Sequence, residues 1–382
     1  MTKKICFFSG GFAFNRLNRM RFYEKTLPKD TEIFLFTTDR WRGKKDAYQY
    51  EWSGLKRTKI FVAKYNSTLP LQLRKFCREN KIDKIINIGN RASIALFWFA
   101  CLFSQTSYIF NMMGWVPKGR EMIRNLILRE IWDYFFFYFF LIFANKVTSV
   151  DRGVYKRFIG KNKPVFFRLF NKEAVYLPAP LNADLFIPKN KVSARKKFGL
   201  PLNKKIVIFV GRINHNKCGD ILAELIKRNK DILFVVIGRS LLKEFDNLKA
   251  KNLIYFSKKN PEELVDYYNA ADISFLLMRL RASGLGQTTQ ESLACGLPAI
   301  SRELEGIEKT PALIQIPPQK IVYTKLIYDL SYGIKESEKA LKEFFKKSKK
   351  ERERISKIAR NYALKNYSHK IWAEPHAKAY LE

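Results

Sequence analysis

The sequence predicts an α/β protein with two tandem Rossmann-like parallel-sheet domains. Three observations support this fold class. The chain has 382 residues, which is too long for one compact core. Short apolar strands alternate with helix-like segments. The alternation stops in a Pro-, Asn- and Lys-rich stretch, 178–205, and then restarts. We therefore expect an N-terminal domain at 1–180, a linker at 181–203, a C-terminal domain at 204–364 and a terminal helix at 365–382.

The first half supplies the strands of one sheet. Its expected strands are 4–9, 32–38, 59–63, 84–89, 107–111, 146–150 and 174–178, and its expected helices are 69–80, 92–103 and 119–143. Short apolar strands separated by helices are typical of a parallel sheet that is covered on both faces.

The second half repeats this pattern. Its expected strands are 206–212, 232–238, 253–257, 273–277 and 299–301, and its expected helices are 217–228, 241–250, 261–271, 287–294 and 334–362. Asn260 followed by Pro261 and Glu263 is a typical helix start, with a capping side chain, a proline in the first turn and an early acid.

The composition points to an anionic partner. Lys and Arg total 71 against 35 Asp and Glu, which gives a net charge of +36. Such an excess favours nucleic acid, an anionic membrane surface or phosphorylated substrates. No nucleic-acid motif accompanies it, and aromatic residues are not interleaved with the basic runs, so nucleic acid is the weakest of the three. The five cysteines and three histidines show no metal-ligand spacing, so we expect no metal.

The sequence allows two environments for one aromatic run. Tyr134 to Ala144 reads YFFFYFFLIFA, and no segment reaches the roughly twenty apolar residues that a spanning helix needs. The run either packs in the interior or lies in a membrane interface. We expect a cytoplasmic protein that attaches peripherally to the inner face of the cell membrane.

Two segments of the second half could bind phosphates. In FVGRINHNKCGD, a strand ends at Gly211, and Arg212 and Lys217 follow at the start of the next helix. Ligands bind at that edge of a doubly wound sheet, and two cations with free backbone amides suit a diphosphate. Two ordinary surface cations would look the same in this Lys-rich chain.

The other segment, SGLGQTTQESLACGLPAIS, runs from Ser283 to Ser301. Glycines permit close backbone approach, and amides at a helix N-terminus favour phosphate oxygens. A carboxylate early in the helix can accept hydrogen bonds from a ribose diol. The candidate donor-binding residues are Gly211, Ser283, Gly284, Leu285, Gly286, Gln287, Thr288, Thr289 and Glu291.

A third segment, FFSGGFAFNRLNRMRFYEK, follows the first strand. Its glycine pair is not the G-x-G-x-x-G of nicotinamide-binding proteins. Its helix carries Arg16, Arg19 and Arg21, which suggests an anionic or lipid-bearing ligand or a plain helix start. The candidate acceptor-side residues are Gly10, Gly11, Asn15, Arg16 and Gly114.

Together these segments resemble glycosyltransferase family 4, the retaining transferases with the GT-B fold. FVGRINHNKCGD is similar to that family's V-G-R-L-x-x-x-K-G, with Cys218 where a glycine is usual. SGLGQTTQESLACGLPAI is similar to its E-G-F-G-L-x-x-x-E-A-M-A-C-G-x-P-V-I. The resemblance implies two domains facing a central cleft and a last helix that crosses back to the N-terminal domain.

The resemblance also implies roles for the residues. Arg212 and Lys217 would be the catalytic pair, which neutralises the diphosphate of a nucleotide-sugar donor in place of a metal ion. Glu291 would hold the ribose. The acceptor would be a membrane-associated glycan or a lipid-phosphate-linked compound in cell-surface glycan synthesis.

Two departures keep a second hypothesis open. Ser283 stands where the family has the first carboxylate of its E-x7-E pair, and Met113 stands where a histidine often precedes the glycine at 114. The alternative is a catalytically silent homologue that binds nucleotide, glycan or an anionic membrane.

Overall fold

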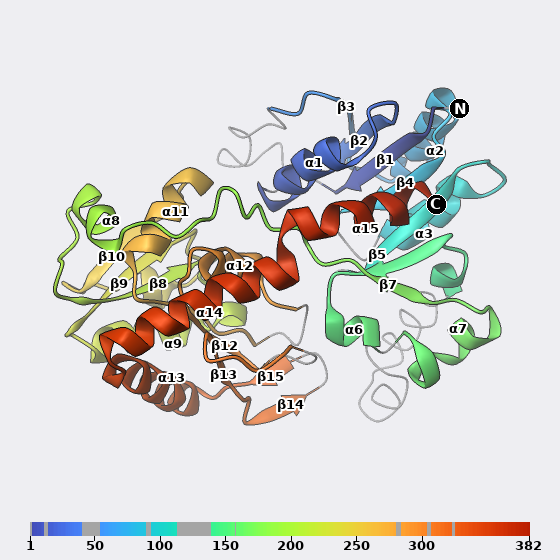
Figure 1. The fold of residues 1–382 in the computed structure, drawn as a ribbon. Helices are drawn as coiled ribbons and strands as arrows, with labels where there is room; N and C mark the ends of the chain where they lie inside the picture. The colour runs from blue at the N-terminus through green and yellow to red at the C-terminus, as the bar shows by residue number, and fades with distance from the viewer. Residues whose placement is uncertain are drawn as a thin grey trace. The chain divides into compact units, whose positions relative to one another are not determined.

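The computed structural model describes residues 2–10, 14–39, 54–88, 93–112, 139–156, 158–279, 284–303, 307–322 and 325–382 (Figure 1). The chain forms two compact units. The first unit comprises Met1–Pro180 with His369–Glu382, and the second comprises Leu181–Ser368.

The first unit is built on a seven-stranded sheet in the order β3-β2-β1-β4-β5-β6-β7, in which all pairs are parallel. The strands are β1 (Lys4–Ser9), β2 (Glu32–Thr38), β3 (Thr58–Ala63), β4 (Lys84–Asn87), β5 (Ser107–Met112), β6 (Lys146–Ser149) and β7 (Ala174–Tyr176). Alternate residues of β1 enter different cores. Cys6 and Phe8 pack with α2 (Leu69–Asn80) and α3 (Ser93–Cys101), whereas Ile5 and Phe7 pack with α1 (Phe14–Thr26). Helices therefore cover both faces, as expected for a parallel sheet.

The last helix, α15 (His369–Leu381), belongs to this first unit and packs along α1 (Figure 1). Buried aromatic rings join the two helices. The Tyr23 and Tyr380 hydroxyls lie 3.3 Å apart, and their rings meet edge to face. The smaller helices of the unit are α6 (Arg152–Lys156), η1 (Gly160–Asn162) and α7 (Val165–Leu169).

The second unit holds a six-stranded parallel sheet in the order β10-β9-β8-β11-β12-β13. The strands are β8 (Lys205–Val210), β9 (Ile232–Ile237), β10 (Leu253–Phe256), β11 (Ile273–Leu276), β12 (Ala299–Arg302) and β13 (Leu313–Ile316), with a separate hairpin of β14 (Lys320–Val322) and β15 (Lys325–Ile327). One face packs on α8 (Lys191–Lys197), α11 (Pro261–Ala270), α12 (Gln287–Ala294) and α14 (Lys349–Tyr367). The other packs on α9 (Gly219–Arg228), α10 (Lys243–Asp246) and α13 (Leu330–Lys346). Two doubly wound parallel sheets confirm the predicted fold class.

Three expected elements differ from the structure. The expected linker, 181–203, is part of the second unit, because Asn190 caps α8 and the buried Arg195 donates to Ala270 O and Asp272. The expected helix 241–250 shrinks to the single turn of α10. The expected helix 334–362 is two helices, since Ser348 starts α14 by accepting from the Glu351 amide.

Candidate functional site

The crossover point of the second sheet lies between β8 and β11, where the strand order reverses. Ligands of doubly wound sheets bind at the carboxyl ends of the two strands that flank this point. Gly211, Arg212 and Lys217 follow β8, and 284–291 follow β11. The two segments that the sequence singled out for phosphate binding therefore leave adjacent strands at the same edge.

Lys217 lies directly over Gly211. A Cβ atom at Gly211 would be 2.6 Å from the Lys217 Nζ, and the φ of 152° also favours glycine there. Burial, together with the positive charge of Arg212, lowers the pKa of Lys217 to about 8. Arg212 is exposed, and within the described ranges neither cation has an ion pair. Two close cations with no carboxylate partner suit an anionic ligand.

The backbone below these cations is packed tightly. A Cβ atom at Gly238, just after β9, would lie 2.0 Å from the Gly211 carbonyl oxygen. Gly238 has a φ of 142°, and its amide bonds to Phe256 O. Sequence reasoning gave Gly238 no role, although a glycine ending a second apolar strand was the available signal.

Lys217 does not begin a helix, contrary to prediction. It ends the 3₁₀ turn η2 (His215–Lys217), and α9 begins at Gly219 after Cys218, which has a left-handed φ of 50°. The amides of this turn are used internally. Those of Lys217 and Gly219 donate to Asn214 O, and that of Cys218 donates to His215 O. The side chains, rather than free amides, therefore make this half of the site attractive to anions.

The N-terminus of α12 supplies the amides instead. Its first bonded amides, those of Thr289 and Gln290, both donate to Gly286 O. In the described part of the chain, the amides of Gly286, Gln287 and Thr288 have no acceptor. Unbonded amides at a helix start attract phosphate oxygens.

Of the other candidate donor-binding residues, some are half-buried and some lie in the core. Gly284, Gly286, Gln287 and Thr288 are half-buried, whereas Leu285 is 5% exposed and Thr289 is 2% exposed. Leu285 is a core residue whose carbonyl accepts from Gln290 Nε2 at 2.8 Å. Ser283 lies outside the described residues.

Glu291 lies one turn inside α12 and is 6% exposed. Its Oε2 accepts a hydrogen bond from the Tyr268 hydroxyl at 3.2 Å. Burial raises the pKa of Glu291 to about 8, although hydrogen bonds from Tyr268 and Gln287 oppose the shift. The carboxyl group is therefore largely protonated at neutral pH.

Arg279, in the loop after β11, is not among the site residues predicted from the sequence. Its guanidinium donates to both Asp220 carboxylate oxygens at 2.7 and 2.9 Å. It also donates to His215 O, and its backbone amide donates to Asn216 O. Arg279 thus ties the loop after β11 to the turn that carries Lys217. A cation directly after an apolar strand was the signal.

The acceptor-side candidates are only partly described. Gly11 and Gly114 lie outside the described residues, as does the side chain of Asn15. Gly10 follows β1, where its carbonyl accepts from Thr38 Oγ1. Arg16 Nη1 donates to Ser9 Oγ at 3.1 Å, and burial, with the nearby charge of Arg19, lowers the pKa of Arg16.

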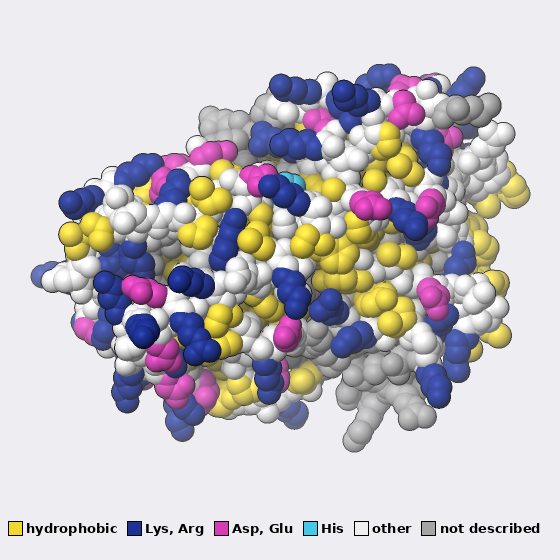
Figure 2. Space-filling model, in the orientation of Figure 1, with side chains coloured by type: hydrophobic (Ala, Val, Ile, Leu, Met, Phe, Trp, Pro, Cys, Tyr) yellow, Lys and Arg dark blue, Asp and Glu magenta, His cyan; other side chains and the backbone are white. Residues whose placement is uncertain are grey.

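The helix α1 does not present a row of free arginines. Arg19 is 6% exposed, and Arg16 and Arg21 are half-buried, so the helix does not expose its three arginines as a cationic face. Lys and Arg side chains are instead scattered across both units (Figure 2). The described end of the aromatic run is largely interior, since Leu141 and Ala144 are buried and Phe143 is half-exposed. No helix in the described ranges is long and apolar enough to span a membrane.

The lowered pKa of Lys217 predicts how pH affects ligand binding. A bound diphosphate stabilises the charged ammonium, so its pKa is higher in the complex than in the free protein. Affinity for a nucleoside diphosphate, whose terminal phosphate loses its last proton near about pH 6, should therefore be constant between about pH 7 and pH 8 and fall by up to about tenfold per pH unit above pH 8. Calorimetric titrations at several pH values measure this; the Lys217→Arg variant, whose guanidinium stays charged, should show no such decline.

Glu291 predicts a pH effect on stability. Its pKa is raised in the folded protein, so stability is fully present below its ordinary pKa and is lost as pH rises towards 8. Relative to Glu291→Gln, the wild-type free energy of unfolding should fall by about 2.5 kcal/mol between about pH 5 and pH 7. Urea unfolding at the two pH values measures this difference. If the free energy of unfolding depended equally on pH in the two proteins, the pKa of Glu291 would not be raised in the folded state.

Part of the second unit is similar in sequence to known proteins. Residues 190–362 match the family described as Glycosyl transferases group 1. A D-inositol 3-phosphate glycosyltransferase from Mycolicibacterium smegmatis is 29% identical over 138 residues, which cover 33% of this chain and 31% of that protein. The chain therefore aligns with only about a third of the length of such curated relatives.

Solved structures match over nearly the whole chain. Sucrose-phosphate synthase from Thermosynechococcus elongatus has a TM-score of 0.72 at 14% identity and covers 99% of this chain and 98% of its own. Anabaena HepE in complex with UDP has a TM-score of 0.68 at 11% identity, with 98% of each chain covered. The chain thus has the two-sheet fold of the GT-B glycosyltransferases, and its residues 190–362 are similar to glycosyl transferases of group 1.

Proposed function

We propose that the protein is a metal-independent, retaining glycosyltransferase of family 4 that uses a nucleotide diphosphate sugar. The observation that carries this proposal is that Arg212 and Lys217, which have no carboxylate partner among the described residues, lie at the same sheet edge as the α12 amides that find no acceptor there. Both lie at the crossover edge of the segment that matches the group 1 family. That Anabaena HepE binds UDP supports a nucleotide ligand at this edge.

The chemistry follows from where negative charge develops. As the glycosidic bond to the donor breaks, the leaving diphosphate gains charge, and fixed positive groups lower the barrier to its departure. Lys217 and Arg212 supply that charge, and the α12 amides add hydrogen bonds. Glu291 is the candidate ribose contact, and its carboxyl group is hydrogen-bonded by Tyr268 and by Gln287, the first residue of α12.

For the acceptor, we propose a membrane-associated glycan or a lipid-phosphate-linked compound, reached from the cytoplasmic face. The net charge of +36 supports attachment to an anionic surface. Sedimentation with vesicles containing phosphatidylglycerol, compared with neutral vesicles, tests this part separately.

A panel of radiolabelled UDP-, GDP- and ADP-sugars, incubated with the protein and a membrane extract, tests the reaction. We expect transfer from one donor, retention of the anomeric configuration by NMR, and no loss of rate in EDTA. No transfer and no hydrolysis with any donor would falsify the proposal.

Ser283 favours one alternative, a silent homologue that binds nucleotide without turnover. It predicts that a nucleoside diphosphate raises the melting temperature while no sugar moves. Turnover that copurifies with the protein, and disappears in the Lys217→Ala variant, excludes this alternative.

A further inference from the structure

A second concave site lies at the opposite edge of the C-terminal sheet. It is a groove of about 820 Å³ that is formed entirely within the second unit. Its lining includes the residues just before β8, β11 and β12, the helix α8, the end of α13 and the first half of α14. It therefore lies at the amino ends of the strands, away from the crossover edge where the carboxyl ends meet. We call it the far-edge groove.

Cations are concentrated in this groove beyond the average of the chain. Eight of its 25 lining residues are Lys or Arg, against 71 of 382 overall, and only Asp272 and Glu353 are acidic. The lining cations are Lys189, Lys191, Arg195, Lys204, Lys205, Lys349, Arg352 and Lys357. A concave surface lined by one sign of charge focuses its field on whatever enters.

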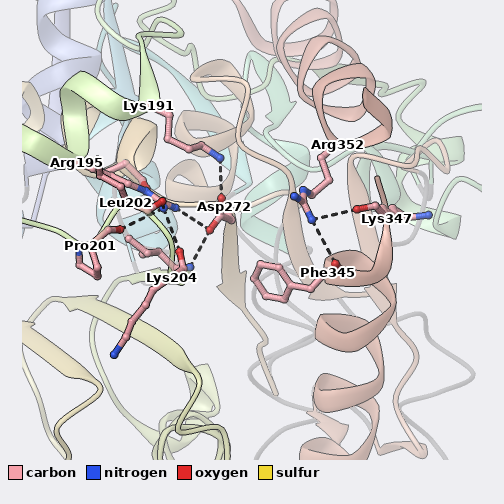
Figure 3. Close-up of polar contacts among 11 residues, drawn as sticks. Lys191, Arg195, Pro201, Leu202, Lys204, Asp272, Phe345, Lys347 and Arg352 are labelled. Carbon is pink, nitrogen blue, oxygen red and sulfur yellow. Dashed lines mark hydrogen bonds and ion pairs between the residues drawn. The ribbon is translucent and has the colours of Figure 1, made fainter. Parts of the chain in front are cut away.

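Four of these eight cations form ion pairs within the second unit. Asp272 accepts from Lys191 Nζ and Arg195 Nη2, each at 2.8 Å, on one wall of the groove (Figure 3). Lys189 pairs with Asp266, and Lys205 pairs with Asp231. These four cations already have carboxylate partners, although Lys191 and Arg195 share the single carboxylate of Asp272.

The other four cations have no carboxylate partner among the residues that the structure describes. Within the described ranges, Lys204, Lys349 and Lys357 form no ion pair, and all three are exposed. The half-buried Arg352 is held in place from one side. Its Nη1 donates to Phe345 O and Lys347 O, the free carbonyls at the end of α13, at 3.3 and 3.1 Å. Its remaining N–H groups have no partner in the part of the chain described.

The arrangement selects a compact ligand. Figure 3 shows Asp272, with its partners Lys191 and Arg195, on one side of the groove and Arg352 on the other, while the Lys204 side chain extends away from the space between them. A flat membrane surface cannot reach facing walls at once, whereas a small polyanion between them can. We propose that the far-edge groove binds a soluble, multiply phosphorylated small molecule. This site is separate from the diphosphate site and does not depend on the proposed function.

Tripolyphosphate is a suitable probe because it carries several phosphates and no other recognition group. The test uses the full chain with Arg212→Ala and Lys217→Ala, so that the crossover edge no longer contributes its cations. On this background, calorimetry should show one tripolyphosphate per chain. Adding Lys349→Glu and Lys357→Glu should weaken binding at least about tenfold, because two attractive charges become repulsive.

A matched variant controls for net charge. Lys249→Glu with Lys335→Glu makes the same charge change at exposed positions of the same unit outside the groove. We expect it to keep the affinity within about threefold, with unfolding curves unchanged for both variants. Equal weakening by both pairs, or no weakening by the groove pair, overturns the proposal. Preference for phosphatidylglycerol vesicles over tripolyphosphate, lost in the groove pair, overturns it in favour of a membrane contact.

Discussion

Replacing both Arg212 and Lys217 by Met should weaken nucleoside diphosphate binding by about a thousandfold. Each charge-assisted contact to a phosphate contributes roughly 2 kcal/mol, and about 1.4 kcal/mol corresponds to a factor of ten. Neither side chain has a carboxylate partner among the described residues, so their loss leaves no buried charge unpaired. Calorimetric titration with UDP, GDP and ADP measures the effect.

The control for this double variant is Lys249→Met with Lys251→Met. Both lysines are exposed in the same unit and outside the crossover edge, and their replacement removes the same net charge. Affinity should change less than about threefold. If the control weakened binding as much as the double variant did, attraction by the overall charge would explain binding, and the diphosphate site would be misplaced.

Replacing Gly238 by Ala should lower the free energy of unfolding of the second unit by at least about 4 kcal/mol. The new Cβ would stand 2.0 Å from Gly211 O, so β8 and β9 must move apart. The backbone φ of 142° adds strain. Because Gly211 lies under Lys217, any protein that still folds should also bind nucleotide poorly. Urea unfolding followed by circular dichroism measures the stability.

The Gly199→Ala variant distinguishes the cost of backbone strain from the cost of a steric clash. Gly199 has a φ of 62° in the same unit, and nothing lies within 4 Å of its added Cβ. We expect it to cost only about 1 kcal/mol. A similar loss for both variants would show that the contact between the two strand ends is softer than the geometry indicates.

Repeated patterns made the fold predictable. The strands were readable because each is a short apolar run that ends at a polar or glycine residue. Sheet order was not readable, since sequence does not say which strands pair. The break at Ser348 had an available signal, because Ser348 and Glu351 form an S-x-x-E helix start. The prediction of a helix at 241–250 was wrong, because the apolar residues there pack from a single helical turn and the loop that follows it.

The candidate site was predictable in position but less so in geometry. Strand ends and glycines located Lys217 and α12 at one edge. The left-handed conformation of Cys218, a residue that rarely adopts it, could not be read from its identity. Nor could the pairing of Arg279 with Asp220, because it joins residues 59 positions apart in the chain. The burial of Glu291 beside Tyr268 of α11 follows from long-range packing, which only the three-dimensional structure supplies.

The rate at which Cys218 is alkylated can report local opening of the turn that carries Lys217. The thiol is inaccessible, and burial raises the pKa of Cys218 to about 12, so the reactive thiolate is scarce while the turn is closed. Alkylation can therefore proceed only during excursions in which the segment next to Lys217 detaches. Its rate reports how often the phosphate-facing turn opens, and a ligand that bridges Lys217 to α12 must slow that rate in proportion to its occupancy.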